Sequence, residues 1–276
     1  MLTLALPILF AVLIWWLSTG LILWVGSHSG LSKQACMVGA SVLAVMAFLL
    51  LFLTRGAETV MAVYTSFLAV IVIWGWHELA FLLGLVTGSR KQACPEGVIG
   101  LARFSMAVEV VIFHELALLA TGMIIAFITL GADNHMAVMT FLILWLMRIS
   151  AKLNLYLGAP NINTDMMPDH LSYMKSYFQR GAISPFFALA ITLGTLTFGY
   201  FAKETWQATG AREATEAALL ATLIALAVIE HWFFVFPFNE TRMWSLFSRA
   251  RKKLTSTKHM TNTDPRSTAR NKAVQM

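Results

Sequence analysis

The sequence has few charged residues and few cysteines. Asp, Glu, Lys and Arg make up 12% of its 276 residues, against about 25% in typical soluble domains, whereas 58% of the residues are hydrophobic. These proportions exclude a water-soluble globular fold. The two cysteines, Cys36 and Cys94, exclude a disulfide framework and a Cys-x-x-Cys zinc knuckle. The net charge of +6 lies mostly in loops and in the tail after Phe238, as in membrane proteins, so we expect no nucleic-acid partner.

Long apolar runs dominate the rest of the chain. Several of them reach the roughly 20 residues that a helix needs to cross the hydrocarbon core of a bilayer. We therefore predict an all-α, polytopic transmembrane helix bundle of about seven helices, which occupies residues 1-247 and lies in a lipid bilayer. The expected spans cover residues 2–25, 35–54, 59–86, 106–130, 137–157, 185–202 and 217–238.

The basic residues predict the orientation of the bundle. Seventeen Lys and Arg residues fall on one side of the membrane and three on the other, when Arg148 and Lys152 are counted with the loop that they approach. Because cytoplasmic loops carry the excess of positive charge, the C-terminus is expected in the cytoplasm and the N-terminus in the periplasm. The loop at 158-184 is then cytoplasmic. Residues 248-276 are expected to form a basic, disordered cytoplasmic tail.

Ionisable residues interrupt four of the apolar runs. Each costs at least about 2.5 to 3.5 kcal/mol at the centre of a membrane helix, so such residues normally face the protein interior. At 1.5 Å per residue, most of them fall at one depth, roughly 4 to 8 Å from the midplane on the cytoplasmic side. The residues are His77, Glu78, His114, Glu115, Arg148, Lys152, Glu230 and His231.

Three interpretations of this cluster remain open. It is a structural ion-pair network, a metal site, or a site for a tetrapyrrole or quinone. The metal would be iron or another divalent ion. Its ligands would be Glu78, His114, Glu115, Glu230 and His231. The residues around these ligands would be His77, Arg148, Lys152, Asp169 and His170. In the third interpretation His114 or His231 ligates the metal of a bacteriochlorophyll-type tetrapyrrole, and Trp232 packs on the ring. Three imidazoles favour a metal, whereas the adjacent His-Glu pairs differ from the Glu-x-x-His spacing of di-iron proteins.

Six separated segments of the chain form a recognisable pattern. They are Trp74-Gly-Trp-His-Glu-Leu, Cys94-Pro-Glu-Gly, His114-Glu-Leu-Ala, Ala151-Lys-Leu-Asn-Leu-Tyr-Leu-Gly, Pro168-Asp-His-Leu and Glu230-His-Trp-Phe. In these segments the chain resembles the PuhE family, photosynthetic complex assembly proteins of purple phototrophic bacteria, and the similarity runs from about the first predicted helix to Phe238. In the family pattern the position of His77 is not always His, so the resemblance does not imply that His77 is a ligand. The better matches to the pattern are Glu78, His114, Glu115, Arg148, Lys152, Glu230 and His231. Pro168-Asp169-His170 matches and is expected to close the site from the water side.

The resemblance implies a function in the inner membrane, either cytoplasmic or intracytoplasmic. It implies a membrane factor, encoded beside the reaction-centre H subunit, that assists assembly of the photosynthetic reaction centre with its core antenna and affects bacteriochlorophyll accumulation. No catalytic activity follows from it. The alternative is a membrane metal-dependent enzyme acting on a pigment, quinone or lipid. A transporter is a third class, favoured only by the short repeat His-Glu-Leu-Ala at 77–80 and 114–117.

The predicted orientation can be measured with a reporter fusion. Alkaline phosphatase fused after Phe238 should be inactive, because the enzyme folds only outside the cytoplasm and the charge asymmetry places this position inside. The same reporter inserted near Lys203 should be active. Strong activity after Phe238 would contradict the predicted number of spans.

Overall fold

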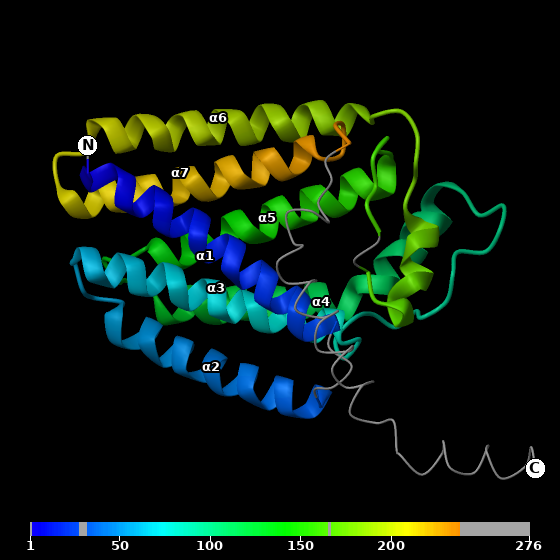
Figure 1. Cartoon of the computed structure of the whole chain (residues 1–276), viewed down its shortest axis with the longest axis horizontal. Coiled ribbons are helices and arrows are strands. Elements are labelled where there is room, and N and C mark those ends of the chain that lie inside the picture. Colours follow the sequence, from blue (N-terminus) through cyan, green and yellow to red (C-terminus); the bar gives the residue numbers. More distant parts are fainter. Residues whose placement is uncertain (1, 28–31, 165–166, 238–276) are drawn as a thin grey trace, which may run out of the picture. The chain divides into compact units, whose positions relative to one another are not determined.

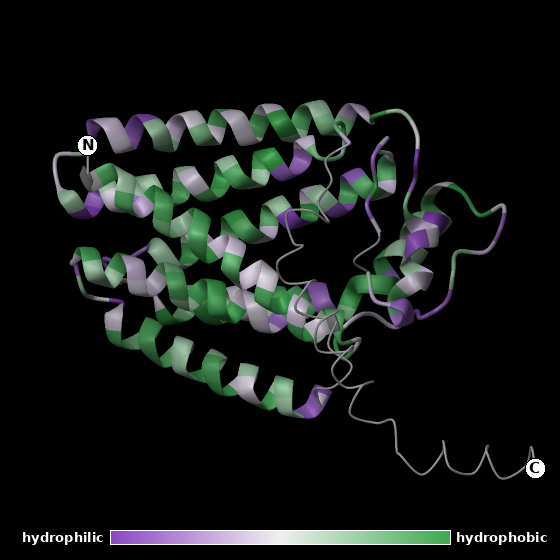
Figure 2. Ribbon diagram, in the orientation of Figure 1, coloured by the Kyte–Doolittle hydropathy of each residue, from purple (hydrophilic) through white to green (hydrophobic). Residues whose placement is uncertain are grey.

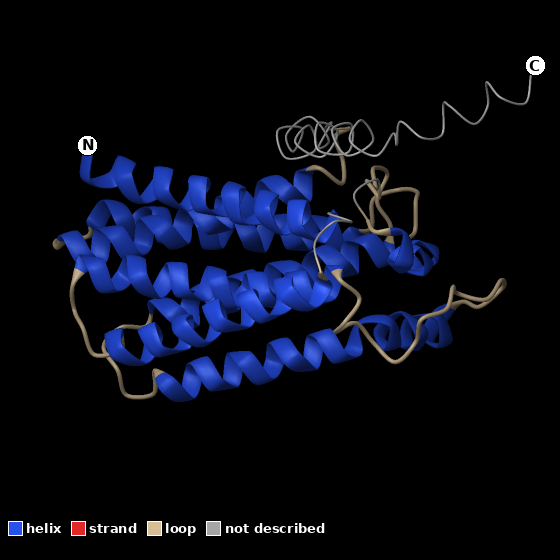
Figure 3. Ribbon diagram, turned by 60° about the horizontal axis from the view of Figure 1, so that its bottom comes forward, coloured by secondary structure: helices blue, strands red, loops and turns tan. Residues whose placement is uncertain are grey.

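The computed structural model describes residues 2–27, 32–164 and 167–237. The predicted all-α class is confirmed: seven helices in these residues are long and apolar enough to cross a membrane, and the only other regular features are a 3-10 helix and an isolated bridge between Ala159 and Arg180 (Figure 3). The helices are α1 (Leu2–Ser27), α2 (Lys33–Thr54), α3 (Val60–Leu82), α4 (Gly100–Ile128), α5 (Met136–Leu157), η1 (Asp169–Tyr177), α6 (Pro185–Gln207) and α7 (Ala211–Trp232). The tail predicted at 248-276 lies outside the described residues.

Local sequence determines where several helices begin and end. The Thr59 side chain accepts a hydrogen bond from the backbone N–H of Ala62 and caps α3, satisfying a donor that the first helical turn leaves free. Pro185 occupies the start of α6, where its missing N–H costs nothing. Gly158, with φ 139°, ends α5 in a conformation that other residues rarely adopt.

Several helix ends differ from the prediction: α7 begins at Ala211 instead of residue 217, and α6 continues to Gln207 instead of residue 202. Helix α3 ends at Leu82 instead of residue 86, and α7 ends at Trp232 instead of residue 238. Helix α4 begins at Gly100 instead of residue 106 and has 29 residues. At 1.5 Å per residue it is about 43 Å long, which exceeds the roughly 30 Å hydrocarbon core. Its first turns therefore extend beyond the ends of the neighbouring helices.

Helices α3 and α7 form the centre of the bundle. Half of the most apolar segment of each is buried, against 11% for α1 and α2. Val63 and Phe67 of α3 pack with Leu219 and Leu223 of α7, while α1 crosses in front of this pair (Figure 1). The outer helices expose large apolar side chains, among them Leu49 of α2 and Leu196 of α6, as expected where lipid replaces water. Hydrophobic residues predominate along these helices (Figure 2).

The connections on one side of the bundle form a folded cap. Leu171, Met174 and Tyr177 of η1 pack against Val110 of α4, and Arg103 of α4 donates a 2.7 Å hydrogen bond to the Tyr177 carbonyl. Figure 1 shows η1 and the loops that follow α3 and α5 at the same end of the helices, opposite the N-terminus. Most of the hydrophilic residues of the described chain gather there (Figure 2).

The segment after α3 lies directly on the backbone of α4. The Thr87 carbonyl accepts a 2.9 Å hydrogen bond from the backbone N–H of His114, and Arg90 N donates to the Glu109 carbonyl at 3.3 Å. A Cβ atom at Gly88 would lie 2.0 Å from the Glu109 carbonyl oxygen. Only glycine permits this close approach, so Gly88 determines how the segment docks.

Gly88→Ala should therefore separate the segment from α4. We expect a loss of about 1 to 3 kcal/mol in the free energy of unfolding, because the added methyl group meets backbone atoms that cannot rotate away. Thermal unfolding of the purified protein in detergent measures the change. Gly39→Ala in α2 is the matched control, since nothing lies within 4 Å of its added Cβ. Equal stability of the two variants would contradict the docking role.

Candidate functional site

Two cations on α5 bind carboxylates from two other helices. Arg148 Nη2 lies 2.7 Å from Glu78 Oε2 of α3, and Lys152 Nζ donates to Glu115 Oε1 of α4. The indole N–H of Trp145 donates to the other Glu115 oxygen at 3.2 Å. Arg148 and Lys152 are one turn apart, so they project from the same face of α5. The two ion pairs on this face connect α5 to α3 and to α4.

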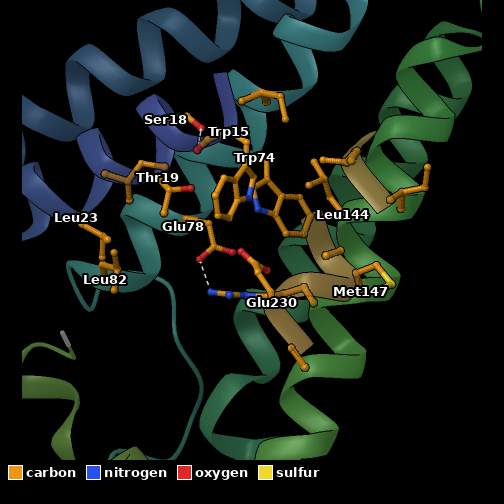
Figure 4. Close-up of a pocket in the computed structure, with 18 residues that line it drawn as sticks. Trp15, Ser18, Thr19, Leu23, Trp74, Glu78, Leu82, Leu144, Met147 and Glu230 are labelled. Atoms are coloured by element: carbon orange, nitrogen blue, oxygen red, sulfur yellow. Dashed lines mark hydrogen bonds and ion pairs between the residues drawn. The ribbon is translucent and has the colours of Figure 1, made fainter. Parts of the chain in front are cut away.

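A cavity of about 260 Å³ opens beside the first of these ion pairs (Figure 4). Helices α1, α3, α5 and α7 form its walls. Glu78, Arg148 and Glu230 supply its charged groups, and Trp15 and Trp74 its aromatic ones. Figure 4 shows Glu78 of α3 and Glu230 of α7 reaching toward one another across the cavity, with Trp15 and Trp74 close to Glu78.

Two of the three charged side chains of the cavity are exposed. The Arg148 side chain exposes 44% of its surface, whereas Glu78 exposes 12%, and Glu230 is also exposed. Oε1 of Glu78 is buried and has no hydrogen-bond partner in the described part of the chain. The guanidinium has five N–H donors in a planar fork. Together these groups can bind the polar end of a molecule whose remainder lies in lipid.

The imidazoles lie apart from the cavity, in the interior. His77 pairs with Thr121 through a 2.9 Å hydrogen bond, and its ring centre is 6.4 Å from that of His114. His231 contacts Ser150 through Nε2 at 2.9 Å and the Ala227 carbonyl through Nδ1 at 2.8 Å. Each of the three histidines is at most 3% exposed. The residues that we predicted to form one cluster therefore fall into two groups. The acidic and basic side chains are at least partly exposed, and the imidazoles are buried.

The described residues do not form a preformed metal centre. No three His, Cys, Asp or Glu side chains among the described residues gather closely enough to hold a metal ion. Of the predicted ligands, Glu78 and Glu115 are held in ion pairs. The described geometry therefore does not fit a metal, and we derive no metal-dependent step. The ligand roles of Glu78, His114, Glu115, Glu230 and His231 stay a prediction that would require these contacts to rearrange.

The tetrapyrrole interpretation meets a similar constraint. Both ring nitrogens of His231 are engaged, and His114 packs against Phe81 with ring centres 4.8 Å apart. Trp232 stacks on Phe236 and is 37% exposed, but it does not line the cavity beside Glu78. Ligation of a pigment by His231 would therefore require the imidazole to leave its present partners. Nδ1 of His114 is buried and has no hydrogen-bond partner in the described part of the chain, so ligation by His114 stays a prediction.

The predicted loop residues lie near the site but do not enter it. Nε2 of His170 is 3.0 Å from the carbonyl oxygen of Leu82, which is one turn beyond Glu78 and lines the cavity. Asp169 is exposed. The η1 segment thus rests on the end of α3 above the cavity.

Glu78 and Glu230 lie near the ends of their helices, whereas Glu115 lies near the middle of its helix. Helix α3 ends at Leu82 and α7 at Trp232, while α4 runs from Gly100 to Ile128. The common depth of these residues in the bilayer stays a prediction.

Comparison with other proteins identifies the family. Residues 1–255 match the model of a family described as protein of unknown function, DUF3623. The chain belongs to this family. It is also 33% identical, over 246 residues, to an uncharacterized 30.4 kDa protein in the puhA 5' region of Rhodobacter capsulatus, a match that covers 86% of this chain and 88% of the relative. No solved structure matches the chain.

Sequence reasoning missed the contribution of α1 to the cavity. Trp15, Ser18 and Thr19 line it. Their spacing of three and four residues places them on one helix face. Two hydroxyls on the same face as a tryptophan were the available indication of an inward-facing surface.

The pairing of Glu115 with Lys152 can be tested by single and double substitutions. Glu115→Gln alone leaves a lysine without its counter-charge and should cost about 3 kcal/mol or more of stability. Glu115→Gln with Lys152→Met should recover most of that loss, because no charge remains unpaired. The amount of folded protein in the membrane and its thermal unfolding measure both effects.

Metal analysis of the same proteins distinguishes the metal interpretation. Under that interpretation Glu115→Gln removes metal from folded protein, and the second substitution restores nothing. Full stability of Glu115→Gln would contradict the ion-pair assignment.

Proposed function

We propose that the protein is a membrane factor that assists assembly of the photosynthetic reaction centre with its core antenna. The observation that carries the proposal is the 33% identical relative from the puhA 5' region, matched over most of both chains. The puhA gene is a reaction-centre gene. The resemblance of the sequence motifs to photosynthetic complex assembly proteins supports the same function. The reaction-centre and core-antenna subunits are the proposed partners.

The cavity gives this proposed function a physical basis. Membrane pigments and quinones have a polar end and an apolar remainder, and the cavity combines Arg148 with two indoles within the bundle. Its volume of about 260 Å³ is close to the lower limit for small-molecule sites, which suits the polar end of such a molecule. We propose that the protein holds a lipid-soluble component of the complex here during assembly and so affects bacteriochlorophyll accumulation.

The location follows from the same reasoning. Seven apolar helices indicate a multi-pass membrane protein. We propose the inner membrane of a phototrophic bacterium, with the folded cap on the cytoplasmic side, because the charge asymmetry of the loops favours that orientation. The cavity then lies in the cytoplasmic half of the bilayer.

Deletion of the gene in its phototrophic host should lower the absorbance of the reaction centre and core antenna and leave respiratory growth intact. Complementation with the wild-type gene should restore the absorbance. Glu230→Gln, which removes a charge from the cavity, should restore less than half of it at equal protein level. Absorption spectra of isolated membranes measure the recovery.

Glu213→Gln is the matched control for this complementation. Glu213 lies on the same helix, is exposed and is in the first turn, so its replacement should restore the full absorbance. An unchanged spectrum in the deletion strain would remove the assembly function. Full rescue by Glu230→Gln would instead leave the proposed assembly function intact and exclude a role of the cavity in it.

A further inference from the structure

A second cavity, of about 300 Å³, lies under the folded cap. It is formed by the start of α2, the segment after α3 and the start of η1. Its polar lining consists of Lys33, Thr87, Lys91, His170 and Tyr173, joined by apolar residues and Gly84. It is distinct from the cavity described above, because no residue lines both, although Leu82 of the first cavity adjoins Leu83 of the second.

The charged side chains that line this cavity are both lysines. Lys33 and Lys91 are both exposed, and no Asp or Glu is among the described residues that line the cavity. Lys33 Nζ contacts the Leu83 carbonyl at 3.4 Å, which uses one of three N–H donors of the ammonium group. No salt bridge in the described part of the chain includes either lysine. Both ammonium groups are thus available to an anion.

Uncharged donors complete the lining. The Tyr173 hydroxyl is buried and has no hydrogen-bond partner within the described ranges, an arrangement that normally costs free energy unless a ligand or water satisfies the group. Nε2 of His170 is 3.0 Å from the Leu82 carbonyl oxygen, which fixes the ring against Gly84. A positive φ of 76° at Gly84 and the closeness of the His170 ring, 2.9 Å from an added Cβ, keep this wall of the cavity in place.

The position of the cavity in the fold indicates the source of the anion. Lys33 is the first residue of α2 and Leu83 follows the last residue of α3, so the cavity lies where the membrane helices end. Lipid phosphates lie at the same level, next to the hydrocarbon core. The apolar side chains of α2 that face outward, including Val38 and Val42, provide a surface for the acyl chains.

We propose that this cavity binds a phosphate-bearing anion, with the headgroup of an anionic phospholipid as the expected source. Lys33 and Lys91 supply the charge. Because Lys33 belongs to α2 and Lys91 to the segment after α3, the bound phosphate joins that segment to the bundle. The proposal does not depend on the assembly function, since it concerns a different cavity.

Native mass spectrometry of the purified full-length protein tests the site. Protein exchanged into phosphatidylglycerol should retain this lipid preferentially over phosphatidylcholine. Lys33→Gln or Lys91→Gln should each reduce retention about fivefold, and the double variant more than tenfold, because each lysine near a membrane surface contributes about a factor of five in binding. Lys175→Gln is the matched control, since Lys175 lies on η1 and is exposed but does not line the cavity.

A competition experiment with inorganic phosphate distinguishes the two sources of the phosphate group. Inorganic phosphate at millimolar concentration should leave the lipid bound if the site takes a headgroup. Release of the lipid, together with lysine-dependent binding of inorganic phosphate, would support the site with soluble phosphate as its ligand. If the double variant does not fold, the exposed Lys91→Gln variant gives the comparison. Equal retention of both lipids with no phosphate binding, or an equal loss in Lys175→Gln, would overturn the proposal.

Discussion

The bundle depends on the neutralisation of charge within a medium that solvates it poorly. Arg148 and Lys152 lie inside the predicted span of α5, where an uncompensated charge costs several kcal/mol. Each finds a carboxylate on a different helix, Glu78 on α3 and Glu115 on α4. Both pairs fix the rotation of α5 about its axis, because the two cations share one face. The cavity exists where this face meets α1 and α7.

Much of the fold could be predicted from the sequence, because apolar run length determines membrane helices almost directly. The seven spans and the all-α class follow from it, and so does the inward direction of Arg148 and Lys152. The ends of the helices were harder to predict. Apolar residues such as Val86 and Val235 continue the runs past Leu82 and Trp232, but here they belong to turns that pack on the bundle. Hydropathy does not distinguish the two cases.

The candidate site could be predicted only as a set of residues. The sequence brought His77, Glu78 and Glu115 to one part of the bundle but could not separate the imidazoles from the carboxylates, because rotation about a helix axis depends on packing. His231 illustrates this point. It is adjacent to Glu230 in the sequence, yet it faces Ser150 of α5 in the interior, whereas Glu230 faces the cavity. The contribution of α1 depends equally on how that helix crosses α3.

The chain order of the paired residues has a consequence for biosynthesis. Glu78 and Glu115 precede Arg148 and Lys152 in the sequence, so α3 and α4 leave the ribosome as acidic segments before their basic partner on α5 is translated. Until then the insertion machinery must accommodate two carboxyl groups, either protonated or in contact with water. Arrival of α5 delivers both cations within one turn. The membrane domain should therefore reach its final helix arrangement when the fifth helix inserts. It should not form in steps as each pair of helices inserts.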